Sequence, residues 1–215
     1  MKIEADALLF DNDGTLVSSV DSALRCWTRW AEEAGLTAAD FARVPMHGRP
    51  SAEIVADLIP AAGVPAAVAR IEDLEVEAVA EGVDPVPGAL ALLGSLAAGR
   101  WAVVTSASRR LAEARLAAVG IHPPTVIAAD DITRGKPDPE PFLLAAARLG
   151  VAPERCVVFE DAPAGLASGR AAGMRTVALT TSHPAAELTA DAVVSDLTAV
   201  SVQVNGGSLE ILIAD

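Results

Sequence analysis

Four groups of polar side chains follow short apolar runs of the sequence, and their residue types could act on a phosphate ester or hold a metal ion. The groups are Asp11 with Asp13, Ser106 with Ser108, Lys136, and Glu160 with Asp161. A carboxylate can attack phosphorus or transfer a proton, and hydroxyl, amide and ammonium groups can hold phosphate oxygens. Each group alone is equally compatible with a turn or a helix cap. Their positions relative to one another therefore decide the interpretation.

The elements that would position these groups alternate between strands and helices. Apolar runs rich in β-branched residues predict strands at 5–10, 101–105, 125–129, 156–160, 176–179 and 191–194. Helical spacing predicts helices at about 88–98, 108–119, 139–149 and 163–173. Such alternation is typical of a parallel sheet covered by helices on both faces, so the predicted fold class is α/β with a Rossmann-like sheet. Two apolar runs around Asn205-Gly206-Gly207 add a hairpin at 200–213.

All four polar groups follow predicted strands. The carboxyl ends of parallel strands lie on one edge of the sheet, where ligands bind, so the groups converge there. Clustered carboxylates repel one another unless a cation lies among them, and Mg²⁺ prefers oxygen ligands and leaves positions for a substrate phosphate. A carboxylate nucleophile, a second carboxylate, hydroxyl and amide donors, a lysine and a metal are the parts required for phosphoryl transfer.

One long segment interrupts the alternation. Residues 17–83 contain no convincing strand, and several stretches carry apolar residues at helical spacing, namely 20–35, 50–59 and 65–81. The segment VDPVPGA at their end has the proline and glycine content of a stiff linker or hinge. We therefore expect a core domain of residues 1–16 and 84–215 with an inserted helical domain of residues 17–83.

Composition argues against several classes of function. The formal charge of −13 and the lack of a basic cluster larger than Arg109-Arg110 argue against nucleic-acid binding. The sequence has no apolar run of about 18 residues or more, and Glu4 stands where a signal peptide would carry basic charge. Cys26 and Cys156 lie in apolar segments without metal-ligand spacing, as in the core of a cytosolic protein. We expect a cytoplasmic protein, by default a monomer, whose partner is a small phosphorylated metabolite.

The four groups also resemble, in order and spacing, the motifs of the haloacid dehalogenase-like phosphatase superfamily. FDNDGTLV is similar to the first motif, VVTSAS to the second, RGKPDPEPF to the third and VVFEDAPAGLASGRAAGM to the fourth. Within the superfamily the chain looks like the sugar-phosphatase and β-phosphoglucomutase branch, which includes 2-deoxyglucose-6-phosphatase and glycerol-phosphatase type enzymes. The resemblance covers nearly the whole chain. It implies that the segment 17–83 is a small cap that closes over the site and selects the alcohol.

The resemblance implies a role for each matching residue. Asp11 would attack phosphorus to form an aspartyl-phosphate, and Asp13 would protonate the leaving alcohol and then activate water. Ser106 and nearby amides, including that of Ala107, would hold the phosphate, and Lys136 would bridge the nucleophile and the phosphate oxygens. True dehalogenases resemble these enzymes but lack the second acid, so Asp13 argues against dehalogenation.

The resemblance implies a Mg²⁺ site as well. Its ligands would be the Asp11 carboxylate, the backbone carbonyl of Asp13 and Asp161, with Glu160 as a direct or supporting ligand. Lys136 is one of only two lysines, beside fourteen arginines. A compact ammonium suits a position between a carboxylate and a phosphate better than the broad planar fork of arginine.

Further residues bear on the substrate. Arg49 in HGRPS and Arg109 in SASRR are candidates to contact distal polar groups of the substrate, with a solvated surface arginine as the equally weighted alternative; His47 is more often a structural loop residue than a catalytic one. Two positions depart from the pattern of this branch. Ser18 stands where an aspartate is usual, which bears on the cap hinge and on the orientation of the second acid. Ala23 stands where mutases carry a cap histidine.

These observations favour a Mg²⁺-dependent phosphatase that hydrolyses a small sugar or polyol phosphate through an aspartyl-phosphate intermediate. The first alternative is a phosphosugar mutase of the β-phosphoglucomutase type, which Ala23 disfavours. The second is a metabolite-binding module without catalysis, which would require the loss of Asp11, Asp13 or Lys136, and all three are present.

Overall fold

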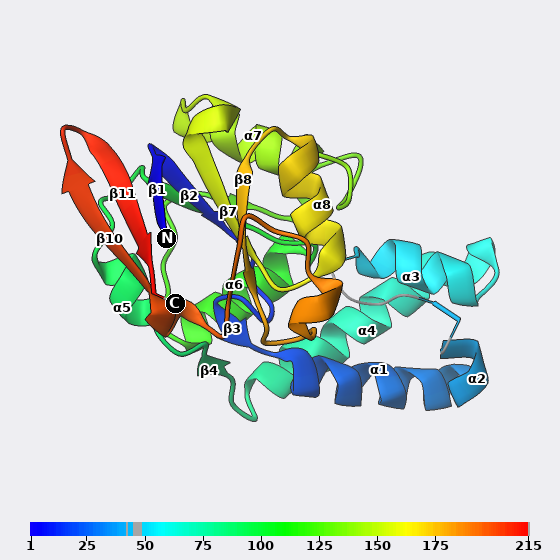
Figure 1. The fold of residues 1–215 in the computed structure, drawn as a ribbon. Coiled ribbons are helices and arrows are strands. Elements are labelled where there is room, and N and C mark those ends of the chain that lie inside the picture. Colours follow the sequence, from blue (N-terminus) through cyan, green and yellow to red (C-terminus); the bar gives the residue numbers. More distant parts are fainter. Residues whose placement is uncertain (42, 45–48, 215) are drawn as a thin grey trace.

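A six-stranded parallel sheet forms the centre of the computed structural model, which describes residues 1–41, 43–44 and 49–214 (Figure 1). The strands follow the order β6-β5-β2-β7-β8-β9, and each neighbouring pair is parallel. Their bounds are β2 Ala7–Phe10, β5 Trp101–Val104, β6 Val126–Ile127, β7 Cys156–Glu160, β8 Arg175–Leu179 and β9 Ala192–Val194. This arrangement confirms the predicted α/β class, and it makes β2 and β7 neighbours at the centre of the sheet.

Helices cover both faces of this sheet, because its central strands β2, β5 and β7 are buried along their whole length. On one face Phe10 shares a core cluster with Leu116, and on the other Leu9 packs with Phe142. The covering helices are α5 Ala89–Gly94 and α6 Arg109–Ala118 on the first face, and α7 Glu140–Leu149 and α8 Pro163–Ala171 on the second (Figure 1). Polar side chains that follow the strands therefore meet at the sheet edge, outside both apolar layers.

The first predicted strand, 5–10, is two strands in different sheets. Strand β1 (Lys2–Ala5) pairs with the terminal hairpin in an antiparallel sheet of order β1-β11-β10, and only the following residues enter the parallel sheet. Asp6 lies at the break, where its carboxylate accepts two hydrogen bonds of 3.0 Å from the guanidinium of Arg155. The predicted hairpin is confirmed as β10 (Val200–Asn205) and β11 (Ser208–Ile213).

The inserted segment is helical, as predicted. Its helices are α1 Val20–Ala34, α2 Ala38–Phe41, α3 Ser51–Leu58 and α4 Val64–Val79. They surround their own apolar cluster, in which Trp27 and Trp30 pack edge to face with ring centroids 5.6 Å apart. Figure 1 shows these helices together beyond one end of the parallel sheet. Short 3₁₀ turns connect other elements, at Ala61–Gly63, Ala129–Asp131, Pro153–Arg155, Ala185–Glu187 and Leu197–Ala199.

A short antiparallel pair marks the two ends of the insertion. Strand β3 (Val17–Ser18) pairs with β4 (Asp84–Pro85). The expectation that 17–82 holds no strand is thus wrong by two residues, because a strand of this length leaves no readable periodicity. The domain boundaries themselves stay a prediction. Among the described residues, no helix is both long and apolar enough to cross a membrane.

Candidate active site

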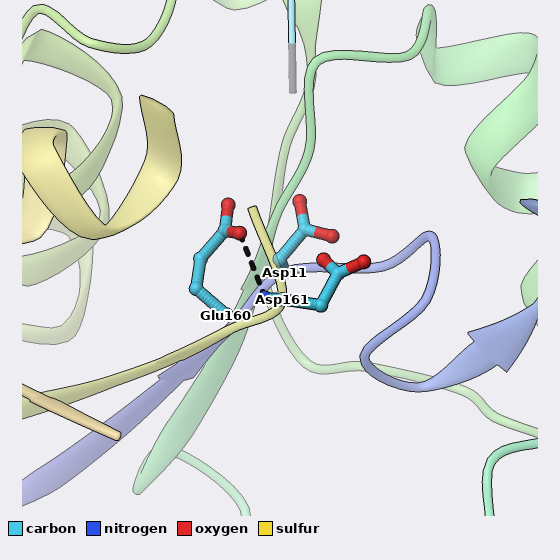
Figure 2. A group of neighbouring side chains, drawn as sticks. All are labelled: Asp11, Glu160 and Asp161. Carbon is cyan, nitrogen blue, oxygen red and sulfur yellow. Dashed lines mark hydrogen bonds between the residues drawn. The ribbon is translucent and has the colours of Figure 1, made fainter. Parts of the chain in front are cut away.

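Three carboxylates meet where β2 and β7 end. Asp11 follows β2, Glu160 is the last residue of β7, and Asp161 follows it. One carboxylate oxygen from each residue lies within 4.8 Å of those of the other two, and all three residues are buried. Figure 2 shows the three side chains side by side at this sheet edge. The register that places Phe10 opposite Phe159 brings the following residues together.

Lys136 reaches the same cluster from the loop before α7. Its Nζ lies 2.5 Å from Oδ1 of Asp11, 2.8 Å from Oε1 of Glu160 and 2.9 Å from the carbonyl oxygen of Val104. The side chain is 1% exposed. An ammonium has three N–H donors and no acceptor, so these three oxygens satisfy it completely.

Neighbouring groups hold the two carboxylates of β7 in place. Oε2 of Glu160 accepts hydrogen bonds from the backbone N–H groups of Asp161 and Ala162, at 2.9 and 2.8 Å. Asp161 accepts hydrogen bonds from the hydroxyls of Thr15 and Ser182. These contacts fix both carboxylates relative to the strand, independently of the lysine.

Two glycines of the sequence motifs give these carboxylates room. A Cβ at Gly14 would lie 2.1 Å from Oδ2 of Asp161, and a Cβ at Gly165 would lie 1.7 Å from Oε1 of Glu160. Gly14 also has a φ of +84°, a conformation that L side chains rarely adopt. The glycines of DGT and APAG are therefore required by close approach to the acids.

The buried cluster lacks positive charge. Burial, with help from neighbouring carboxylates, raises the pKa of Asp11 well above its usual value, although Lys136 opposes the shift. Burial and Glu160 raise the pKa of Asp161 to about 7. Burial disfavours the charged form of Lys136, but Asp11 and Glu160 outweigh it and raise the lysine pKa. One ammonium cannot balance three carboxylates, so this all-oxygen donor set fits a divalent cation.

Asp13 has a different environment, which the sequence interpretation did not include. Its Oδ1 accepts a 2.6 Å hydrogen bond from the hydroxyl of Ser19 and lies 2.9 Å from a guanidinium nitrogen of Arg115. A second nitrogen of Arg115 lies 3.0 Å from Oε1 of Glu75 in α4. A charged residue on the apolar stripe of a predicted helix was the available signal for both members of this pair.

The structure places the remaining predicted residues unequally. Ser106 and Ala107 line the same pocket as Asp11, and the Ala107 amide donates to the Thr105 hydroxyl at 3.1 Å. Arg49 also lines this pocket while it pairs with carboxylates of its own domain, Asp57 at 2.9 Å and Glu53 at 3.5 Å.

Arg109 is not brought to the pocket. Its guanidinium lies 2.5 Å from Asp131 and 3.5 Å from Glu113, and it is not among the described residues that line the pocket. His47 lies outside the described residues.

The inserted helices form the opposite wall of the pocket, and this wall is mainly apolar. Helices α1 and α3 contribute Val20, Ala23, Leu24, Trp27 and Ile54. The acids and hydroxyls at the sheet edge form the other wall, so the pocket pairs a polar reacting end with an enclosing lid. Such a pocket accepts a small ester whose charged end points to the sheet.

The sequence motifs and the fold identify the family of this chain. Residues 5–173 match the haloacid dehalogenase-like hydrolase family, and the chain belongs to it. Hexitol phosphatase A of Escherichia coli (strain K12) is 41% identical over 80% of this chain and 81% of its own. Validoxylamine A 7'-phosphate phosphatase of Streptomyces hygroscopicus subsp. limoneus is 38% identical over 89% of this chain and 94% of its own. Among solved structures, CbbY from Rhodobacter sphaeroides in complex with xylulose-(1,5)bisphosphate is 25% identical with a TM-score of 0.76, covering 90% and 95%.

Proposed function

We propose that this protein is a phosphatase that hydrolyses a phosphate monoester of a small sugar or polyol. The observation that carries the proposal is the contact of Lys136 with both Asp11 and Glu160 inside the carboxylate cluster, in a chain of the haloacid dehalogenase-like family. The names of two relatives, a hexitol phosphatase and a phosphatase of validoxylamine A 7'-phosphate, support a hydroxyl-rich leaving group.

In the proposed reaction Asp11 and Asp13 share the work. A carboxylate oxygen of Asp11 attacks phosphorus, the bond from phosphorus to the ester oxygen breaks, and the leaving alkoxide takes a proton from Asp13. Water then loses a proton to Asp13 as its oxygen attacks the aspartyl-phosphate, which releases inorganic phosphate and restores Asp11. Ser106 and the Ala107 amide bind phosphate oxygens, for which the amide must give up its contact with Thr105.

The cation proposed for the carboxylate cluster is Mg²⁺. Asp11 and Asp161 would hold it with the backbone carbonyl of Asp13, while Glu160 supports the site by orienting Lys136. When bound, Mg²⁺ neutralises negative charge on the phosphate and on the carboxylates. Lys136 holds Asp11 on the side of the cluster that faces Glu160.

The mutase alternative is less well supported by the pocket. A mutase must return the phosphoryl group to a second hydroxyl of the same sugar, which calls for a proton-transferring side chain on the cap side. Ala23 lines that side of the pocket and has no such group. Phosphate released steadily from a hexose 1-phosphate, without interconversion to the 6-phosphate, separates hydrolysis from mutase activity.

The test of the proposed function is Asp11→Asn, which keeps the size of the side chain and removes the nucleophile. We expect phosphate release from a hexitol phosphate to fall by more than about 1000-fold, since loss of a nucleophile removes the covalent route. Asp21→Asn, at an exposed position of α1, is the matched control and should keep wild-type turnover. Ordinary activity in the Asp11 variant would refute the mechanism.

A further inference from the structure

Arg115 is a buried cation that the proposed reaction does not use. It lies on α6 with its side chain 5% exposed, and its guanidinium contacts two carboxylates at once. One nitrogen lies 2.9 Å from Oδ1 of Asp13, and the other lies 3.0 Å from Oε1 of Glu75. Burial opposes the charge of Arg115, but the two acids outweigh it and raise its pKa. The arginine therefore stays charged between them.

Glu75 is as unusual a residue for its place as Arg115. It lies on the buried stripe of α4 with Ile71, Leu74 and Ala78, and its side chain is 5% exposed. Burial raises the pKa of Glu75 despite the opposing effect of Arg115. Apolar residues of similar volume in place of a buried ion pair are often equally stable or more stable. Stability alone is thus a weak reason for this pair, and its contact with Asp13 suggests another.

Two other contacts join the same helices and provide a comparison. The hydroxyl of Ser108 donates to Glu72 at 2.6 Å, and Arg110 pairs with Asp73 at 2.7 Å. The second of these pairs is exposed, with side chains 56% and 48% accessible. Of the three contacts between α6 and α4, only that of Arg115 continues to a residue of the proposed reaction.

We propose that Arg115 is a positioning residue that orients the acid Asp13 and, through Glu75, ties this orientation to the seating of the inserted helices on the core. The inference rests on the proposed function, because it assigns a partner to the proposed acid. Ser19 and Arg115 both donate to Oδ1 of Asp13, which fixes the plane of the carboxylate. Oδ2 is then the oxygen that exchanges a proton with the leaving alcohol and with water.

The seating of the inserted helices is visible at a second point. A Cβ at Gly135 would lie 2.6 Å from Cγ of Pro50, so the loop before α3 lies directly on the loop that carries Lys136. If these helices moved away from the core, Glu75 would leave Arg115 with Asp13 as its single carboxylate partner. The guanidinium would then lose one of the two contacts that hold its plane.

The experiment compares two double variants of the full-length protein. Arg115→Met with Glu75→Leu removes the buried pair without leaving an unpaired buried charge. Arg110→Met with Asp73→Leu removes the exposed pair between the same helices. For each, kcat and KM are measured with a hexitol phosphate, and kcat/KM with a series of substituted phenyl phosphates of differing leaving-group pKa. Thermal melting followed by circular dichroism establishes that each variant is folded.

We expect the buried-pair variant to lose about 10-fold to 100-fold in kcat, since a misplaced acid forfeits part of the gain from general acid catalysis. Its kcat/KM should also fall more steeply than that of the wild type as leaving-group pKa rises, because poor leaving groups depend most on protonation. Arg115→Lys should recover part of the loss by keeping a cation beside Asp13. The exposed-pair variant should match the wild type in kcat and in this dependence.

Two results would overturn the inference. One is a folded buried-pair variant with wild-type kcat. The other is a loss confined to KM with an unchanged leaving-group dependence, which would assign Arg115 and Glu75 to the seating of the inserted helices alone. Failure of the proposed function is distinguishable, because it appears in Asp11→Asn as retained activity, whatever the Arg115 variants do.

Discussion

At the scale of single residues, the three hydrogen bonds of Lys136 explain why this position holds a lysine. Its ammonium is surrounded by Asp11, Glu160 and the carbonyl of Val104 at 2.5 to 2.9 Å. Arginine carries five donors in a flat fork, and its distal nitrogens are further from the backbone. A guanidinium would leave donors unsatisfied in this buried space and would push the carboxylates apart.

Lys136→Arg should therefore lose most activity although it keeps the charge. We expect kcat for phosphate release to fall by about 100-fold or more, because displacement of a reacting group by about 1 Å is enough for such a loss. The chain provides its own control in Lys2, which is 53% exposed and pairs with Glu210 at the surface. Lys2→Arg should leave kcat unchanged. A Lys136→Arg variant with near wild-type kcat would contradict the steric explanation.

At the scale of elements, the first turn of α8 and the end of β7 form one unit around Glu160. Gly165 lies in that turn, and any Cβ there would overlap the Glu160 carboxylate. Gly165→Ala should displace Glu160 from Lys136 and lower phosphatase activity by at least about tenfold, as expected when a positioning shell shifts. The loss should appear in kcat, measured with a saturating hexitol phosphate.

Gly94 is the matched control for this prediction. It also lies in a helix, α5, and a Cβ there would have no neighbour within 4 Å. Gly94→Ala should keep full activity and should not lower the melting temperature, since alanine is favoured over glycine in a helix by roughly 0.5–1 kcal/mol. Equal activity in the two alanine variants would mean that the approach of α8 to Glu160 is unimportant.

The same scale separates what the sequence could predict from what it could not. Strand ends are local signals, so the placement of Asp11, Glu160 and Asp161 at one sheet edge follows from the apolar runs that precede them. The contact between Arg115 and Glu75 depends on how α6 packs against α4, and these residues are 40 positions apart. No local pattern fixes the rotation of one helix against another, so this pair became visible only in the structure.

The split of the first predicted strand has a similar cause. The run from Lys2 to Phe10 reads as continuous in sequence, yet Asp6 pairs with Arg155 and separates β1 from β2. The partner of β1 is the terminal hairpin, at the other end of the chain. Sheet membership here depends on pairing across about two hundred residues, which periodicity within a short window cannot report.

At the scale of the whole molecule, stability should depend on the cation and on pH through Asp161. Its pKa in the folded protein is raised from 3.8 to about 7, so without a cation the folded state binds this proton more tightly than the unfolded chain does. The contribution of Asp161 to the free energy of unfolding therefore decreases as pH rises from about 4 to about 7, and stays constant above that range. Asn at this position carries no such proton.

In EDTA, Asp161→Asn should consequently gain melting temperature relative to the wild type as pH rises from 5 to 8. Addition of Mg²⁺ at pH 8 should reverse the order, because a ligand at about 100 times its Kd stabilises the folded state by about 2.7 kcal/mol, and the variant lacks one of the proposed ligands. Differential scanning calorimetry at both pH values, with EDTA or Mg²⁺, measures the four differences.

Asp21→Asn should follow the wild type in every condition, since its carboxylate is exposed on α1. The sign of the EDTA difference is the decisive quantity, because the other carboxylates of the chain contribute equally to both proteins and cancel. A difference that stays constant between pH 5 and 8 would show that Asp161 is ionised in the folded protein without a cation. An equal rise in melting temperature with Mg²⁺ in the Asp161 variant would place the cation elsewhere than in the carboxylate cluster.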